Sequence, residues 1–167
     1  MTDLPEIKIF TVGGTIDKVY FDKKSTYLVG ESLVGEILRN ANVTFAFQIE
    51  SILRKDSLDM TDADRQLVYD KIHADPHELV VVTHGTDTMI ETAKKLRGMP
   101  DKTIVLTGSM QPARFKDSDA VFNVGCAIAA VQTLPNGVYI VMNGRIFDPG
   151  RVRKNVEQNR FERVNPE

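Results

Sequence analysis

Four short runs of apolar, largely β-branched residues restrict the folds open to this chain more than any other feature of its sequence. They are separated by longer segments with helical patterning, and they span Ile7 to Val12, Leu79 to Thr83, Thr103 to Thr107 and Val138 to Met142. Continuous apolar runs of this length are typical of strands buried on both faces of a parallel sheet. A weaker strand is expected within Thr44 to Ile52. Strands alternating with helices predict a single α/β domain over residues 1–167, a three-layer sandwich whose mostly parallel sheet is of the flavodoxin or Rossmann type.

One helical segment between these runs carries a clear start signal. Thr61 followed three residues later by Asp64 predicts a capped helix that buries Leu67, Val68 and Ile72. A helix begun in this way would cover one face of the predicted sheet.

A second long apolar stretch, before Leu134, also predicts a helix. Asp117 or Ser118 is expected to cap it. It contains Cys126, which is the only cysteine of the chain and therefore excludes an internal disulfide. We expect this cysteine to be a small buried apolar side chain.

The composition excludes several classes of function. A net charge of −2 and a pI near 5.9 give no reason to expect a nucleic-acid partner. The sequence shows neither a basic-then-apolar leader nor an apolar run that approaches the roughly 20 residues of a membrane span. We therefore expect a cytoplasmic protein without a membrane partner.

Two of the predicted strands end in glycine followed by threonine. Gly14-Thr15 follows the first run, and Gly85-Thr86-Asp87 follows the second. In open α/β sheets, ligands bind where parallel strands end at their carboxyl edges. The two threonines therefore predict a pocket for a small polar molecule, although Asp87 alone is also typical of a helix start.

The motifs predict no cofactor and no metal. The glycines form neither G-x-G-x-x-G nor a P-loop, and His73, His77 and His84 lack partners at metal-ligand spacing. His84, at the end of a buried strand, is expected to form structural hydrogen bonds rather than to act as a base. A threonine hydroxyl remains as the candidate nucleophile, and it needs a group that removes its proton.

The segment from Asp17 to Gly30 interrupts the regular alternation with lysines, tyrosines and acidic residues. Two interpretations remain open from its composition: an exposed hairpin, or a mobile lid that brings a tyrosine over the site. Among the lysines, Lys154 is the best placed in chain order to act as a base, but a solvated side chain is the favoured interpretation of any single lysine in a surface run.

Taken together, the two threonine segments resemble the signatures of the bacterial-type L-asparaginases, the threonine amidohydrolases of the asparaginase/glutaminase family. The similarity extends from about Ile7 to Lys154. Beside the signatures Gly13-Gly14-Thr15-Ile16 and His84-Gly85-Thr86-Asp87-Thr88-Met89, it includes the blocks Ser25-Thr26-Tyr27-Leu28-Val29-Gly30, Asp56-Ser57-Leu58-Asp59-Met60, Thr107-Gly108-Ser109-Met110 and Arg151-Val152-Arg153-Lys154-Asn155.

This resemblance implies hydrolysis of L-asparagine to L-aspartate and ammonia, with weaker glutaminase activity and no cofactor. Thr15 is expected to be the nucleophile that forms an acyl-enzyme with the side-chain amide carbon. Tyr27 is expected to help activate Thr15 and to close the site. Thr86 and Lys154 are expected to form a second hydroxyl–amine pair that assists proton transfer, with Asp87 beside them.

The same resemblance implies a binding site for a zwitterionic amino acid. Asp87 is expected to hold the α-amino group and Ser57 the α-carboxylate, with Asp56 nearby and Thr86 in the same site. The backbone beside Gly14 is expected to donate hydrogen bonds to the developing oxyanion. These are the acceptor and donor types that an ammonium and a carboxylate require.

Typical members of that family are about twice as long and carry a carboxy-terminal domain, which is expected to be absent here. Two explanations are open: a short form that completes its site through another subunit, or a piece of a longer protein. A homo-oligomer is expected if the protein is an asparaginase. The alternatives to an asparaginase are a non-catalytic amino-acid-binding module and an amidase subunit that is active only with a partner protein.

Overall fold

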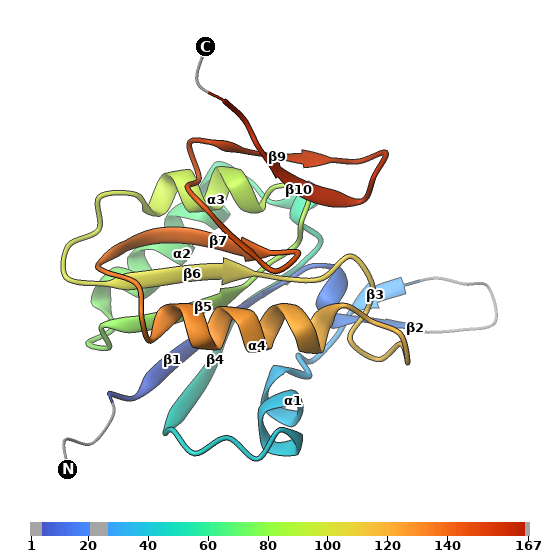
Figure 1. Cartoon of the computed structure of the whole chain (residues 1–167), viewed down its shortest axis with the longest axis horizontal. Helices are drawn as coiled ribbons and strands as arrows, with labels where there is room; N and C mark the ends of the chain where they lie inside the picture. The colour runs from blue at the N-terminus through green and yellow to red at the C-terminus, as the bar shows by residue number, and fades with distance from the viewer. Residues whose placement is uncertain (1–4, 21–26, 166–167) are drawn as a thin grey trace.

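A computed structural model describes residues 5–20 and 27–165 of the chain, apart from the side chains of Tyr20 and Tyr27. Its centre is a six-stranded sheet in the order β4-β1-β5-β6-β7-β8 (Figure 1). The strands span Ile7–Gly13 (β1), Phe47–Lys55 (β4), Leu79–Thr83 (β5), Thr103–Thr107 (β6), Gly137–Met142 (β7) and Arg145–Phe147 (β8). The first five are parallel to one another, and β8 is antiparallel to β7. The four apolar runs and the weaker candidate are therefore confirmed as strands of one mostly parallel sheet.

The strand order creates a switch point between β1 and β5. After β1 the next strand of the sheet along the chain is β4, on one side, whereas β5 is followed by β6 and then β7 on the other. The pairs Ile9 with Val81 and Thr11 with Thr83 show that β1 and β5 run level with each other to their carboxyl ends. Ligands of flavodoxin-like folds bind at such a switch point, beyond the ends of the strands. The topology therefore selects the loops that follow β1 and β5.

Among the described residues, four α-helices cover the two faces of the sheet: Val34–Asn40 (α1), Asp62–Ala74 (α2), Met89–Leu96 (α3) and Ala120–Val131 (α4). In Figure 1, α4 lies in front of the sheet and α2 and α3 lie behind it. Successive side chains of a strand point to opposite faces. Phe10 and Val12 accordingly pack in the cluster with α2 and α3, whereas Ile7 and Ile9 pack in the cluster with α1 and α4. This arrangement is the predicted three-layer sandwich.

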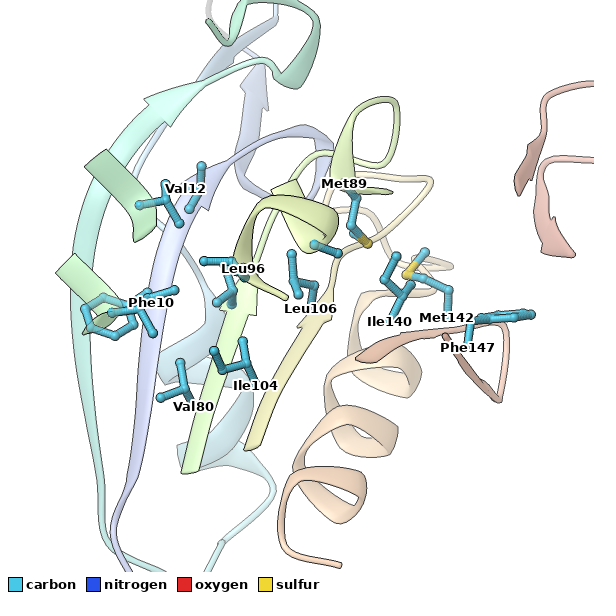
Figure 2. Packing of buried hydrophobic residues seen from close by; sticks show 14 of the residues in the cluster. Phe10, Val12, Val80, Met89, Leu96, Ile104, Leu106, Ile140, Met142 and Phe147 are labelled. Carbon is cyan, nitrogen blue, oxygen red and sulfur yellow. The ribbon is translucent and has the colours of Figure 1, made fainter. Parts of the chain in front are cut away.

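The larger part of the core lies on the face covered by α2 and α3. Figure 2 shows side chains of β1, β5 and β6 packed together with Leu96 of α3; the strand residues are Phe10, Val80, Ile104 and Leu106. All five are completely buried. Complete burial of such a side chain is worth about 1.5–3 kcal/mol relative to its exposed state. The strands whose ends carry the candidate site are therefore fixed by a buried hydrophobic core.

The capping box of α2 is confirmed, but one of the side chains that it was expected to bury is not. Thr61 Oγ1 accepts a hydrogen bond from the Asp64 amide at 3.2 Å, and Asp64 Oδ2 accepts one from the Thr61 amide at 2.9 Å. Val68 and Ile72 are buried, whereas Leu67 is 40% exposed. Val68 and Ile72 are four residues apart and share one helix face, and Leu67 lies about 100° away from it.

The predictions for α4 need two corrections. The N-cap residue of α4 is Asp119 rather than Asp117 or Ser118, and its side chain does not cap the helix. Ser118 Oγ accepts from the Ala120 amide at 3.1 Å. Asp119 lies next to the helix and turns its carboxylate to the amide of Met110, at 2.9 Å. Cys126 is only partly buried, since it lies at the border of the helix face that packs on the sheet. With 12 residues in α4, neither this nor any other described helix is long and apolar enough to cross a membrane.

Two antiparallel hairpins lie outside the central sheet. Lys18–Tyr20 (β2) pairs with Tyr27–Val29 (β3), and Val152–Asn155 (β9) pairs with Arg160–Arg163 (β10). The first pairing confirms the hairpin interpretation of the segment after Asp17. A lid function stays a prediction, because residues 21–26 and the Tyr27 side chain lie outside the described part of the chain.

A charged cluster beside the amino-terminal ends of the strands makes stability depend on pH. His77 Nδ1 lies 2.6 Å from Asp75 Oδ1, and His77 Nε2 lies 3.1 Å from Glu6 Oε2. Partial burial acts to lower the pKa of His77, but the two carboxylates outweigh burial and raise the pKa above its usual 6.5. Because the folded-state pKa is raised, the resulting stabilisation is complete below pH 6.5 and is lost as pH rises above 6.5 through the higher pKa of the folded state.

We therefore expect His77→Gln to lower the free energy of unfolding by about 1 kcal/mol at pH 6, and by less at pH 9. Denaturant titrations at the two pH values measure this difference. His73→Gln is a matched control, because His73 is exposed on α2. A loss that is the same at both pH values would contradict the ion-pair explanation.

Candidate active site

The two glycine–threonine loops are in direct backbone contact. A Cβ atom added to Gly14 would lie 2.2 Å from Gly85 Cα and 2.3 Å from Gly85 N, closer than real Cβ contacts. Only a residue without a side chain fits there, and Gly14 also has a φ of +87°, which favours glycine. The residues that follow, Thr15 and Thr86, are thereby held on adjoining loops. The structure thus brings together two segments that lie 71 residues apart in the sequence.

Ser57 docks a third segment onto this contact. It begins the short 3-10 turn η2 (Ser57–Asp59) after β4, and its side chain is buried. A Cβ on Gly85 would lie 2.5 Å from Ser57 Oγ. The Ser57 hydroxyl accepts from the Thr88 amide at 3.3 Å, and Thr88 Oγ1 donates to the Ser57 carbonyl at 2.8 Å. Ser57 therefore lies against the second threonine segment, at a fixed place.

Lys154 reaches this segment from β9. Its Nζ donates to Thr86 Oγ1 at 2.8 Å and lies 2.6 Å from Asp87 Oδ1. Thr86 is buried, the Lys154 side chain is 16% exposed and the Asp87 side chain is 40% exposed. The three side chains form a hydroxyl–ammonium–carboxylate chain that leads from the interior to the surface. Lys154 is therefore not the freely solvated lysine that its position in a basic run favoured.

Thr15 opens the single 3-10 turn η1 (Thr15–Asp17) after β1. The turn is closed by the Asp17 amide, which donates to the Gly14 carbonyl at 3.1 Å. Thr15 is only partly buried, and its hydroxyl forms no hydrogen bond with the described part of the chain. It is thus an accessible hydroxyl on a rigid turn. The predicted partner Tyr27 lies on β3, and its side chain lies outside the described residues.

His84 fixes the loop that carries Thr86 through buried hydrogen bonds, and it is not placed to act as a base. It is fully buried, and its Nδ1 donates to the Gly85 carbonyl at 2.8 Å, since a carbonyl can only accept. Its Nε2 then accepts from Thr92 Oγ1 at 2.7 Å. Burial lowers the pKa of His84 to about 4, with a smaller contribution from the charge of Arg65. A neutral histidine with both nitrogens occupied is the structural residue that the sequence indicated.

Asp56 and Lys18 add an ion pair on the side of Ser57. Asp56 Oδ2 lies 2.7 Å from Lys18 Nζ, and Asp56 Oδ1 accepts from the Leu58 amide at 3.0 Å. Partial burial acts to raise the pKa of Asp56, but Lys18, the Leu58 amide and the charge of Lys154 together lower it. Lys18 received no role from the sequence. The available signal was its position one 3-10 turn after Thr15.

Asp17 is a second residue that the sequence analysis left without a role. It is 3% exposed, and its Oδ1 has no hydrogen-bond partner in the described part of the chain. Burial raises the pKa of Asp17 to about 6, although the Ser32 hydroxyl and the charges of Arg54 and Arg114 act in the opposite direction. The folded state therefore binds this proton more tightly than the unfolded chain does, and stability falls as pH rises from about 4 through 6.

Relative to the original protein, Asp17→Asn is expected to gain about 2 kcal/mol in its free energy of unfolding between pH 4.5 and pH 7.5. The comparison between the two pH values cancels the cost of burying the new amide. Denaturant titrations of both proteins measure it. A variant whose relative stability does not change between these pH values would show that Asp17 is not held uncharged.

No cluster of three or more histidine, cysteine or acidic side chains suited to a metal occurs among the described residues. The site contains the partly exposed Thr15 hydroxyl and the Lys154 ammonium bonded to the Thr86 hydroxyl. It also contains the carboxylates of Asp56 and Asp87. Together with the switch point of the sheet, these features define an α/β protein with a polar site for a small molecule.

The comparisons with known proteins identify the family. Residues 6–165 match the family model described as "Asparaginase, N-terminal", so the chain belongs to the asparaginase family. It is 35% identical over 166 residues to L-asparaginase 2 of Escherichia coli (strain K12), an alignment that covers 90% of this chain and 47% of that protein.

Solved structures give the same result. The thermostable L-asparaginase from Thermococcus kodakarensis has a TM-score of 0.83 at 26% identity, over 97% of this chain and 52% of that one. L-asparaginase I from Vibrio cholerae has a TM-score of 0.82 at 30% identity, over 98% of this chain and 52% of that one. The chain thus spans about half the length of the relatives that it matches.

Proposed function

We propose that this protein hydrolyses L-asparagine to L-aspartate and ammonia through an ester on Thr15, with weaker activity toward L-glutamine. The observation that carries the proposal is the backbone contact between Gly14 and Gly85, which joins the two threonine loops, together with the Lys154 bridge to Thr86 and Asp87. Family membership supports amide hydrolysis in general.

In this mechanism the Thr15 oxygen attacks the side-chain amide carbon of asparagine, and the Thr15 proton passes to a base. Tyr27 on the neighbouring hairpin is the proposed first acceptor. The tetrahedral intermediate collapses with cleavage of the carbon–nitrogen bond, and the nitrogen leaves as ammonia after it gains a proton. Water then attacks the Thr15 ester, which releases aspartate and restores the hydroxyl.

Lys154 and Thr86 are the proposed second pair for moving protons. The Lys154 ammonium contacts both Thr86 and Asp87 in the free protein. An incoming substrate α-ammonium competes for Asp87, which is the more exposed partner. Its binding would loosen the hold of Asp87 on Lys154 and leave Lys154 free to exchange a proton through Thr86.

Substrate binding is assigned to the groups around the contact. Asp87 would accept from the α-ammonium, and the Ser57 segment, with Asp56, would lie at the α-carboxylate. The backbone amides of the loop after Gly14 would donate to the oxyanion, and each such donor is typically worth about 3 kcal/mol. Glutamine is one methylene longer, and a pocket separates such homologues by about 1–3 kcal/mol.

The test is direct measurement of ammonia and aspartate with L-asparagine, L-glutamine and D-asparagine as substrates. We expect stoichiometric release of both products from L-asparagine and slower release from L-glutamine. Binding of L-aspartate without turnover would favour the alternative of an amino-acid-binding module. Activity that appears only with an added protein would favour a partner-dependent amidase subunit. Homo-oligomer formation and a cytoplasmic location also stay predictions.

A further inference from the structure

Lys18 has no part in the function proposed above, yet its ion pair with Asp56 borders the same site. The two charged groups are 2.7 Å apart, and their side chains are 24% and 28% exposed. An ion pair this accessible typically adds little to stability. A purely structural role therefore leaves its position beside the candidate nucleophile unexplained.

Lys18 is placed by the turn that carries Thr15. Its amide donates to the Thr15 carbonyl and closes η1 at that residue. In a 3-10 turn, residues three apart lie one above the other. The stems of Thr15 and Lys18 therefore leave the turn on the same side. The Lys18 ammonium then extends to Asp56, the residue immediately before Ser57.

A second ion pair of the same kind lies close by, because Asp56 and Asp87 immediately precede Ser57 and Thr88, which are hydrogen-bonded to each other. Lys154 pairs with Asp87 at 2.6 Å, as Lys18 pairs with Asp56 at 2.7 Å. The charge of Lys154 also contributes to lowering the pKa of Asp56, in agreement with this proximity. Two ammonium groups and two carboxylates around one site match the opposite charges of a zwitterionic amino acid.

Lys18 can bind a ligand without leaving Asp56. A lysine ammonium has three donors, and Asp56 is the one acidic partner of Lys18 among the described residues. The remaining donors are free for a carboxylate, and Asp56 fixes the direction in which they point. Ser57, which follows Asp56, supplies a neutral hydroxyl next to this charge.

We propose that Lys18 is a specificity-determining residue that binds the α-carboxylate of the substrate, and that Asp56 positions it. This inference rests on the proposed function only in that the site takes an amino acid. It assigns the preference for carboxylate-bearing amides to a residue of the hairpin β2–β3. Amides without an α-carboxylate are then poor ligands because they lose the charge-assisted bond to Lys18.

Calorimetric binding of three small ligands tests this assignment without requiring turnover. L-Aspartate carries both α-groups, succinate lacks the amino group, and β-alanine lacks the α-carboxylate. Lys18→Met is expected to weaken the binding of L-aspartate and succinate on the order of 10- to 100-fold and to leave β-alanine unchanged. Lys18→Arg, which keeps the charge, is expected to retain most of the affinity for L-aspartate.

Lys55→Met is the matched control. Lys55 is the last residue of the edge strand β4, and it also forms an ion pair, with Asp64 at 2.8 Å. This variant loses the same charge and is expected to bind all three ligands as the original protein does. Lys18→Met with unchanged affinity for L-aspartate, or with an equal loss for all three ligands, would overturn the proposal. So would an original protein that binds none of them.

The two proposals can fail separately. If the protein hydrolyses asparagine but Lys18→Met binds L-aspartate normally, the function stands and the role of Lys18 falls. If the ligands discriminate as expected but no ammonia is released from asparagine, the role of Lys18 stands and the hydrolytic function falls.

Discussion

Thr15→Ala is expected to reduce the rate of asparagine hydrolysis at least about 10³-fold while the protein remains folded. Loss of a nucleophile removes the covalent step, and the remaining donors and binding groups sustain only residual catalysis. The Thr15 side chain is partly exposed and its hydroxyl forms no hydrogen bond with the described residues. Its removal should therefore leave the thermal midpoint within a few degrees. Ammonia release and thermal unfolding measure the two effects.

Thr15→Ser is the matched control, since it keeps a hydroxyl on the same turn and is expected to retain measurable turnover. The position of the covalent bond provides the decisive observation. Acid quenching during turnover, followed by peptide mass spectrometry, is expected to find one aspartyl group on the peptide that contains Thr15. An aspartyl group on Thr86 instead would exchange the roles of the two threonines. Full activity of Thr15→Ala would remove the proposed mechanism altogether.

The fold could be predicted from the sequence because its strands are buried on both faces. A strand such as Val80 to Val82 has to be apolar at every position, so the run is visible without knowledge of its neighbours. Local rules also explain the start of α2 at Thr61. The exposure of Leu67 was missed because helix periodicity defines a face but not the width of the surface that packs against it.

The candidate site was predictable only in part, because its residues come from distant segments. Strand ends and glycines indicated the Thr15 and Thr86 loops, and family resemblance, rather than periodicity, indicated Lys154. Lys18 meets Asp56 because β1 and β4 are neighbours in the sheet. The hydrophobic pattern of a strand does not determine which strand lies beside it. The pairing of Lys18 with Asp56 therefore could not be predicted before the topology was known.

Gly14→Ala is expected to lower the free energy of unfolding by about 2–5 kcal/mol and to abolish asparagine turnover. A side chain at a φ of +87° costs about 1–2 kcal/mol. The new Cβ would also lie 2.2 Å from Gly85 Cα, and Gly85 cannot yield by rotating a side chain. Relief requires the two loops to separate, and overpacking of this kind typically costs a further 1–3 kcal/mol. Denaturant titration and ammonia release measure both effects.

Two other glycines separate the backbone strain from the contact. Gly98 has a φ of +79° and no atom within 4 Å of an added Cβ, so Gly98→Ala is expected to cost only the strain, about 1–2 kcal/mol. Gly125 lies in α4 with open space around it, so Gly125→Ala is expected to stabilise the protein by about 0.5–1 kcal/mol. Stability should therefore decrease in the order Gly125→Ala, original protein, Gly98→Ala, Gly14→Ala. If Gly14→Ala is no less stable than Gly98→Ala, then the two loops are not in tight contact.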